Sequence, residues 1–240
     1  MVSAWASENE IVLGQVKTDN KSNEITAIPS LLNLLSVKDS VVSIDAMGCQ
    51  KNIAKLIRKK KADYILALKG NQSALKEQVA GAFNHIVPHS ESKSIDKGHG
   101  RIEERKCTVI TDFGLIEEAD KWKDLNSIIK IASKRTEVLT GKESQEIRYY
   151  ISSCLFDAER FNQYIRNHWG IENKLHWILD VNFSEDKSRI RKGYADQNFS
   201  VIRRIALNMI RLEDSIKKSK KAKMKISAID NHYRETVLKI

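Results

Sequence analysis

The sequence predicts an α/β fold with a mixed sheet, and three observations favour this class. Residues 41–44 form an apolar run, residues 53–57 carry apolar side chains at helical spacing, and residues 64–68 form a second apolar run. A strand, a helix and a strand in this order are typical of parallel pairing, because parallel strands need a crossover connection. A hairpin is predicted upstream of these elements.

That hairpin begins at the N-terminal residue. Residues 1–6 and 10–16 read as two short strands, and residues 7–9 form a polar turn between them. Apolar residues then recur at helical spacing from Ile25 to Leu35, which predicts a helix with Pro29 near its first turn.

The second half of the chain changes in character twice. Short β-prone runs between polar turns predict a β-rich insertion at about residues 90–154. A helical pattern resumes at Asp157 and persists to about Leu212, with a break around residues 181–192. We therefore expect one domain over residues 1–212 that contains the insertion, followed by a basic tail over residues 213–240. The lysine-rich stretch at residues 217–225 is expected to be a frayed helix or part of that tail.

The composition favours a polyanionic partner. The 240 residues are 41% hydrophobic, which is enough for a sizeable core, and the formal net charge is +10. Residues 187–225 contain thirteen Lys and Arg against three acidic residues. Such a concentration attracts phosphate groups, although a solvated basic surface would give the same count.

Cysteine usage and hydropathy exclude several other classes. Cys49, Cys107 and Cys154 are odd in number and far apart, which argues against a disulfide framework or a thiolate zinc site. The sequence has no apolar run of about 18 residues and no basic-then-apolar signal pattern. We therefore expect a cytoplasmic protein with no membrane partner.

Two carboxylates are candidates for metal-dependent phosphodiester chemistry. Asp45 follows the strand at residues 41–44, and Glu172 lies in a helical segment flanked by Trp169 and Trp177. Carboxylates from different elements are the ligands that Mg²⁺ uses in such chemistry. Taken alone, Asp45 is more typical of a helix N-cap, and Glu172 of an ordinary helix-surface charge.

Two histidines accompany Glu172. If residues 158–180 are helical throughout, His168, Glu172 and His176 share one face at spacings of four residues. The wide separation of the two histidines argues against a zinc pair, so contact with DNA phosphate, or orientation of Glu172, is the better interpretation for His168. The flanking tryptophans are more typical of core packing than of base stacking.

Five segments, in this order, resemble the H-repeat-associated transposases of bacterial insertion sequences, which belong to the DDE class. The segments are residues 2–6, 17–25, 44–50, 67–72 and 168–173. The resemblance implies an RNase H-like core that cuts and joins double-stranded DNA at insertion-sequence ends. It further implies Mg²⁺, with Mn²⁺ as a substitute, a nucleoid-associated location and a homo-oligomer on DNA.

Carried over by position, Asp45 matches the second catalytic Asp of the family and Glu172 its catalytic Glu. The first catalytic Asp belongs to a strand that precedes the hairpin in the family, so we expect this chain to lack the first core strand and to be incomplete or inactive. Asp19 and Asp39 are possible substitutes for that catalytic Asp, but each lies in a polar loop and not at a buried strand end. The wider Tyr, Arg and Lys signature is not met, since those offsets hold Ile165, His168 and Leu179.

The leading hypothesis is thus an insertion-sequence transposase, and the alternative is a DNA-binding remnant that does not cut. An unrelated α/β protein with a basic tail would leave five ordered segments as coincidence. Some basic or polar side chains are candidates for DNA contact, namely Lys69, Arg101, Arg166, His168 and Lys174. Weaker candidates are Lys17, Lys21, Asn71, His99 and Arg105.

Overall fold

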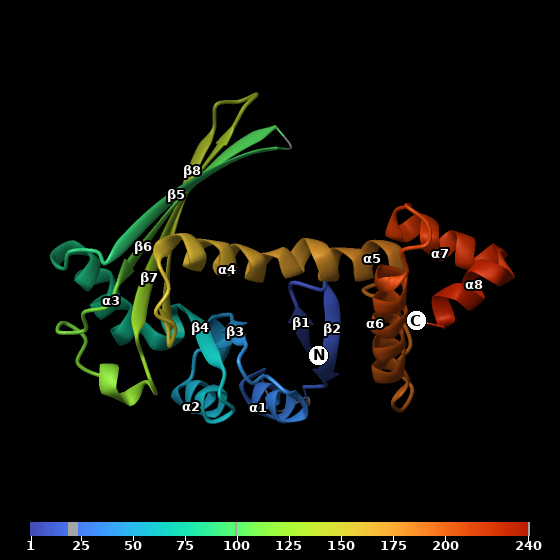
Figure 1. Cartoon of the computed structure of the whole chain (residues 1–240), viewed down its shortest axis with the longest axis horizontal. Coiled ribbons are helices and arrows are strands. Elements are labelled where there is room, and N and C mark those ends of the chain that lie inside the picture. Colours follow the sequence, from blue (N-terminus) through green and yellow to red (C-terminus); the bar gives the residue numbers. More distant parts are fainter. Residues whose placement is uncertain (19–23, 99, 240) are drawn as a thin grey trace. The chain divides into compact units, whose positions relative to one another are not determined.

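A computed structural model describes residues 1–18, 24–98 and 100–239 (Figure 1). The chain divides into two units. The central unit comprises residues 22–168, and the terminal unit combines residues 1–21 with residues 169–240.

Six strands form the sheet of the central unit, in the order β3-β4-β8-β7-β6-β5. β3 (Val41–Ile44) and β4 (Asp63–Leu68) pair in parallel, and α2 (Lys51–Lys59) lies in the connection between them. The parallel strand–helix–strand unit predicted from the sequence is therefore confirmed. β4 pairs antiparallel with β8 on its other side, so the sheet is mixed.

The remaining strands of this sheet form a long antiparallel meander (Figure 1). They are β5 (Ser90–Gly98), β6 (Arg101–Ile110), β7 (Ser127–Glu137) and β8 (Glu143–Ser152). All four lie in the stretch where the sequence predicted β-prone runs. Because β8 pairs with β4, the meander extends the central sheet and does not form a sheet of its own.

The core of the central unit lies around β4. Tyr64, Ile65 and Leu66 of this strand are almost completely buried, as are Ile53 and Ile57 of α2. Burying each such side chain stabilises the fold by roughly 1.5–3 kcal/mol. This burial holds β3 and β4 in place, and with them the start of the loop that follows β3.

The helix predicted near Pro29 differs in one detail. α1 (Glu24–Leu34) contains Pro29 in its interior and not in its first turn. A proline at the sixth position removes one backbone hydrogen bond, because only the first four N–H groups of a helix lack an intrahelical partner. Burial of Ile28, Leu31 and Leu32 offsets that loss.

The other helical segments of the central unit connect its strands or follow the last of them. They are η1 (Ala46–Gly48), η2 (Gly70–Gln72), α3 (Ser73–His85), η3 (Ala119–Lys121) and the part of α4 (Ala158–Ile171) that ends at His168.

The terminal unit begins with the predicted hairpin. β1 (Val2–Ala6) and β2 (Ile11–Val16) pair antiparallel, with a bulge between Ala4 and Trp5. Val12 of β2 belongs to a buried cluster with Leu175, Leu179 and Leu207, all from helical segments near the other end of the chain. The hairpin is thus joined to helices more than 150 residues away in the sequence.

The helical segments of this unit continue from α4. They are η4 (Glu172–His176), which is a π-helix, α5 (Trp177–Phe183), α6 (Ala195–Leu212), α7 (Lys220–Ile229) and α8 (Asn231–Leu238). None of the helices in the described ranges is both long and apolar enough to cross a membrane.

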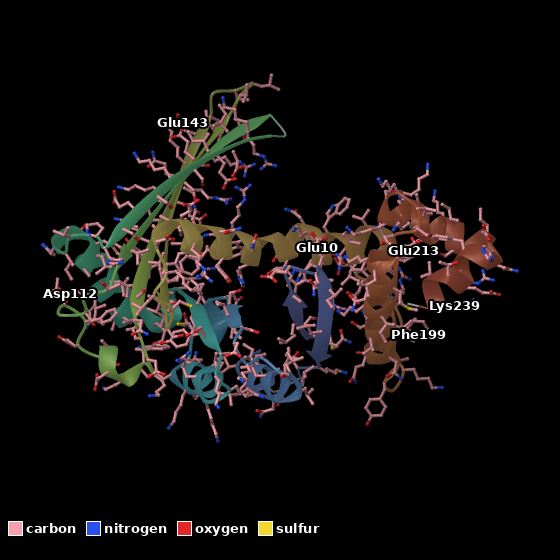
Figure 2. All side chains as sticks on the ribbon, viewed as in Figure 1. Glu10, Asp112, Glu143, Phe199, Glu213 and Lys239 are labelled. Carbon is pink, nitrogen blue, oxygen red and sulfur yellow. The ribbon has the colours of Figure 1, made fainter. Side chains whose placement is uncertain are left out.

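The segment expected to be a basic tail is instead folded into α7 and α8. Ile210, Tyr233 and Val237 form a buried cluster that joins these helices to α6. Glu213, labelled in Figure 2, is almost fully buried and pairs with Lys223 at 3.1 Å. The few apolar side chains that form this cluster lie among many lysines, so the sequence pattern of the segment indicates a polar tail.

Candidate functional site

Asp45 lies directly after β3, with an exposed side chain. One carboxylate oxygen, Oδ1, accepts a hydrogen bond from the backbone N–H of Met47 at 3.2 Å, and so caps η1. The N-cap interpretation considered for the isolated residue is therefore correct as a description of its local geometry. Because the carboxylate remains exposed, this cap does not prevent it from binding a cation as well.

The loop that carries Asp45 is fastened by the residues that follow β4. Asn71 donates from Nδ2 to the carbonyl of Ala46 at 2.6 Å, and Gln72 donates from Nε2 to the carbonyl of Cys49 at 3.0 Å. Asn71 was predicted only as a weak candidate for DNA contact. Its position after the neighbouring parallel strand was the available signal, since the carboxyl ends of such strands meet at one edge.

Gly48 permits the close packing of this loop. A Cβ atom at this position would lie 2.3 Å from Cγ2 of Ile44 and 2.8 Å from Cδ1 of Ile28. Any side chain at residue 48 would therefore force the side chains of Ile44 and Ile28 to shift, so the packing of the Asp45 loop depends on glycine here.

His168 is held on the same side of β3 as Asp45. Its Nδ1 lies 2.9 Å from Oγ of Ser43, within hydrogen-bond distance. Ser43 and Asp45 are two residues apart in extended backbone, with φ −68° and ψ −179° at Asp45, so their side chains leave the strand on one side. Within the central unit, the structure thus brings the end of α4 to the strand that presents Asp45.

Glu172 is exposed and begins the π-helical segment η4. The carbonyl of Glu172 accepts from the N–H of Trp177, five residues later, where an α-helix would pair residues four apart. Short π-helical segments are rare and occur frequently at functional sites.

His168, Glu172 and His176 were predicted to share one helix face, and the π-helical turn makes this prediction wrong for His176. The prediction assumed an uninterrupted α-helix, whereas the wider turn between Glu172 and His176 rotates His176 away from the position that α-helical spacing gives. Glu172 and His168 keep their spacing, because α4 reaches Ile171.

Two of the predicted DNA contacts form ion pairs. Lys174 pairs with Glu10 at 2.8 Å, and its hydrogen bond is the main cause that lowers the pKa of the Glu10 carboxyl. Arg166 pairs with Asp96 of β5. Neither lysine nor arginine is buried, so these surface pairs are weak and exchangeable.

Arg166 belongs to a polar seam between α4 and β5. Along the same face of α4, the N–H of Ala158 donates to Oγ of Ser90 at 2.9 Å, and Asn162 donates to Oγ of Ser94 at 3.0 Å. The bonds of Ala158 and Asn162 hold α4 against the edge strand of the sheet, and the exposed pair of Arg166 with Asp96 continues the same seam.

The other candidates for DNA contact, and the carboxylate of Asp39, take no part in the contacts described above. Lys69 is exposed at the end of β4, and Arg101 is half-buried at the start of β6. Lys17 pairs with Asp196 at 3.4 Å, Arg105 with Glu103 at 2.5 Å, and Asp39 with Lys38 at 3.7 Å. Asp19, Lys21 and His99 lie outside the described residues.

The donor chemistry of the two carboxylates fits Mg²⁺, because each presents exposed oxygen ligands. Asp45 belongs to the central unit and Glu172 to the terminal unit. Within the described ranges, no three His, Cys, Asp or Glu side chains are grouped so that they could hold a metal ion.

The chain is similar to a known domain and to several curated proteins. The family described as "Transposase DDE domain" matches residues 1–209. The chain is 42% identical to "H repeat-associated putative transposase YhhI" of Escherichia coli K12, over 99% of the chain and 65% of that protein. It is 45% identical to "Putative transposase YncI" of Escherichia coli O157:H7, over 99% of the chain and 63% of that protein.

A protein named YbfL, from Escherichia coli K12, is 42% identical over 99% of the chain and 65% of its own length. The chain thus spans slightly less than two thirds of the length of these relatives. No solved structure matches it. The family match over residues 1–209 and the relatives aligned with almost the whole chain show that this chain belongs to the DDE transposase family.

Proposed function

We propose that this chain forms part of an insertion-sequence transposase that cuts and joins double-stranded DNA, and that Asp45 and Glu172 are ligands for Mg²⁺ in that reaction. The observation that carries the proposal is the exposed Asp45 carboxylate at the carboxyl end of a half-buried strand that pairs in parallel with the buried strand β4, in a loop fastened by Asn71 and Gln72. Ligand sites in α/β sheets lie at such strand ends. An RNase H-like arrangement of the core belongs to the same proposal.

The residues around Asp45 would prepare it for this chemistry. The hydrogen bonds to Ala46 and Cys49 fix the loop, so the carboxylate needs little reorganisation when DNA arrives. The bond between Ser43 and His168 holds the end of α4, four residues before Glu172. Mg²⁺, when bound, would activate water or a 3′-hydroxyl and neutralise charge on the phosphate.

Contacts with the DNA backbone are proposed for Lys69, Arg101, Arg166, His168 and Lys174. Lys69 is the strongest of these, because it is exposed and lies two residues before Asn71, which holds the Asp45 loop. Arg166 and Lys174 would exchange a weak surface ion pair for a phosphate.

The second candidate function is DNA binding without cleavage. Two-metal chemistry uses several carboxylates, and the described residues offer no group of three. The basic stretch at residues 187–225 could attract DNA phosphates without any metal.

Nicking of supercoiled plasmid separates the two candidates. If the chain nicks plasmid in the presence of Mg²⁺ or Mn²⁺, we expect that nicking to be lost in Asp45→Asn and in Glu172→Gln. Matched controls are Asp112→Asn and Glu159→Gln, which remove exposed carboxylates elsewhere. Nicking that survives in either ligand variant contradicts the assignment, and a folded, DNA-bound chain that never nicks supports binding alone.

A further inference from the structure

The loop between α5 and α6 carries an unusual concentration of positive charge. Four basic residues occur within six positions, and all four side chains are exposed, namely Lys187, Arg189, Arg191 and Lys192. In the part of the chain that the structure describes, none of the four forms an ion pair with a carboxylate.

The acidic residues at both ends of this loop are engaged by cations outside it. Before the loop, Glu185 pairs with Arg204 of α6 at 2.7 Å, and the Arg204 side chain is only 10% exposed. Beyond the loop, Asp196 pairs with Lys17 at 3.4 Å. Asp186 is exposed, and it faces Asp180, whose pKa is raised first by burial and then by Asp186. The pKa of the Asp196 carboxyl is lowered by the backbone N–H of Gln197, by Lys17 and also by Arg191. Lys187, Arg189 and Lys192 are therefore the cations left uncompensated.

The loop is also held in shape. The N–H of Glu185 donates to the carbonyl of Leu179 at 3.1 Å, and the N–H of Ala195 donates to the carbonyl of Lys192 at 3.1 Å. Ser184 and Gly193 both have positive φ, 51° and 58°, which turns the chain at each end of the segment. A preformed loop loses less conformational entropy when it binds a partner.

An aromatic side chain adjoins the cations. Tyr194 directly precedes α6, and it is 76% exposed, whereas most tyrosines bury part of the ring. Cations that follow a backbone, together with an aromatic ring for a base, are the combination by which proteins hold single-stranded nucleic acid.

We propose that the loop of residues 187–194 is a DNA-binding element that holds backbone phosphates with its four cations and stacks Tyr194 on an unpaired base near a strand end. This inference rests on the proposed function, because DNA is taken as the partner. It adds a surface, and a preference for unpaired bases, that the two carboxylates do not supply.

The test compares two sets of four substitutions in the same unit. The loop set is Lys187→Gln, Arg189→Gln, Arg191→Gln and Lys192→Gln. The control set removes four equally exposed charges at or near α7, namely Lys217→Gln, Lys218→Gln, Lys221→Gln and Lys225→Gln. All eight side chains are exposed, so circular dichroism and the unfolding temperature should be unchanged in both variants.

Duplex DNA with a single-stranded tail is titrated by fluorescence anisotropy at several salt concentrations. Each phosphate contact adds roughly 0.9 to the log–log salt slope on duplex DNA, so we expect the slope to fall by about 2 to 4 in the loop set and by less than about 1 in the control set. Equal losses of salt slope in both sets would mean that the overall positive charge, and not this loop, attracts the DNA. That result would overturn the inference.

Tyr194 is tested separately. Tyr194→Ala should weaken binding to the tailed duplex about tenfold and binding to a blunt duplex less than about twofold, and Tyr194→Phe should restore stacking. Equal effects on both DNAs contradict the stacking role. If the unsubstituted chain binds no DNA, the proposed function fails. If it binds with a steep slope that the loop set leaves unchanged, only this inference fails.

Discussion

Ser43 of β3 and His168 of α4 lie 2.9 Å apart, 125 residues apart in the sequence, and their hydrogen bond joins the helix to the strand that presents Asp45. Two substitutions of similar shape test the contribution of this hydrogen bond. Ser43→Thr keeps a hydroxyl, whereas Ser43→Val fills similar space without one. We expect Ser43→Val to be less stable than Ser43→Thr by about 1 kcal/mol and to nick DNA more slowly.

Thermal unfolding and plasmid nicking measure these two effects. Equal stability and equal nicking in Ser43→Thr and Ser43→Val would show that the hydroxyl plays no part in holding His168.

Asn208 of α6 clamps the backbone of β2. Its Oδ1 accepts from the N–H of Val12 at 2.9 Å, and its Nδ2 donates to the carbonyl of Val12 at 2.8 Å. Asn208→Ala removes both bonds and leaves a buried backbone pair unsatisfied, so we expect a loss of about 1–3 kcal/mol. Asn208→Asp should be no more stable than Asn208→Ala, because a carboxylate can accept from the N–H of Val12 but repels its carbonyl oxygen. An unfolding temperature unchanged in both variants would refute the clamp.

Glu213 should make stability depend on pH in acid. Burial opposes its ionised form, but hydrogen bonds from Ser215, Tyr233 and Lys223 outweigh burial and lower the pKa of the carboxyl from 4.5 to about 2. A lowered carboxyl pKa contributes stability above the unfolded-state value, and this contribution is lost as the pH falls from about 4.5 to about 2.

Glu213→Gln should therefore be less stable than the unsubstituted chain at pH 7, by about 3 kcal/mol, and the difference should shrink below pH 4.5. Thermal melts at a series of pH values measure it. A difference that stays constant from pH 7 to pH 2.5 would contradict this role of the carboxylate.

The three cysteines should be unreactive in the folded chain. Burial raises the pKa of the Cys49 and Cys107 thiols to about 12 and that of Cys154 to about 11. Since the thiolate is the reactive form, alkylation at pH 8 should be slow until denaturant is added. Rapid labelling of all three without denaturant would show that the core opens readily.

Local patterns in the sequence predicted much of the fold. The hairpin, the parallel pair β3 and β4 and the β-prone stretch each follow from a short run of residues, and the structure contains all three. The packing of α7 and α8 on α6 was missed because Tyr233 and Val237 find their partner, Ile210, on another helix.

The candidate site was less accessible to sequence reasoning. Asp45 and Glu172 can be named from strand-end position and resemblance, but the bonds of Asn71 and Ser43 depend on contacts between distant segments. The π-helical turn at Glu172 has no local sequence signal of the kind that caps and turns provide. The ion pair of Arg166 with Asp96 spans 70 residues and is equally invisible in one sequence.

The most direct test of the central claim uses Fe²⁺ in place of Mg²⁺. With ascorbate and peroxide, hydroxyl radicals formed at the bound ion cut the nearby protein backbone. We predict cuts near Asp45 and near Glu172 that are suppressed by excess Mg²⁺, with the cut near Asp45 absent in Asp45→Asn but retained in Asp112→Asn. A cut near Asp45 that persists in Asp45→Asn would show that this carboxylate is not a ligand of the bound ion.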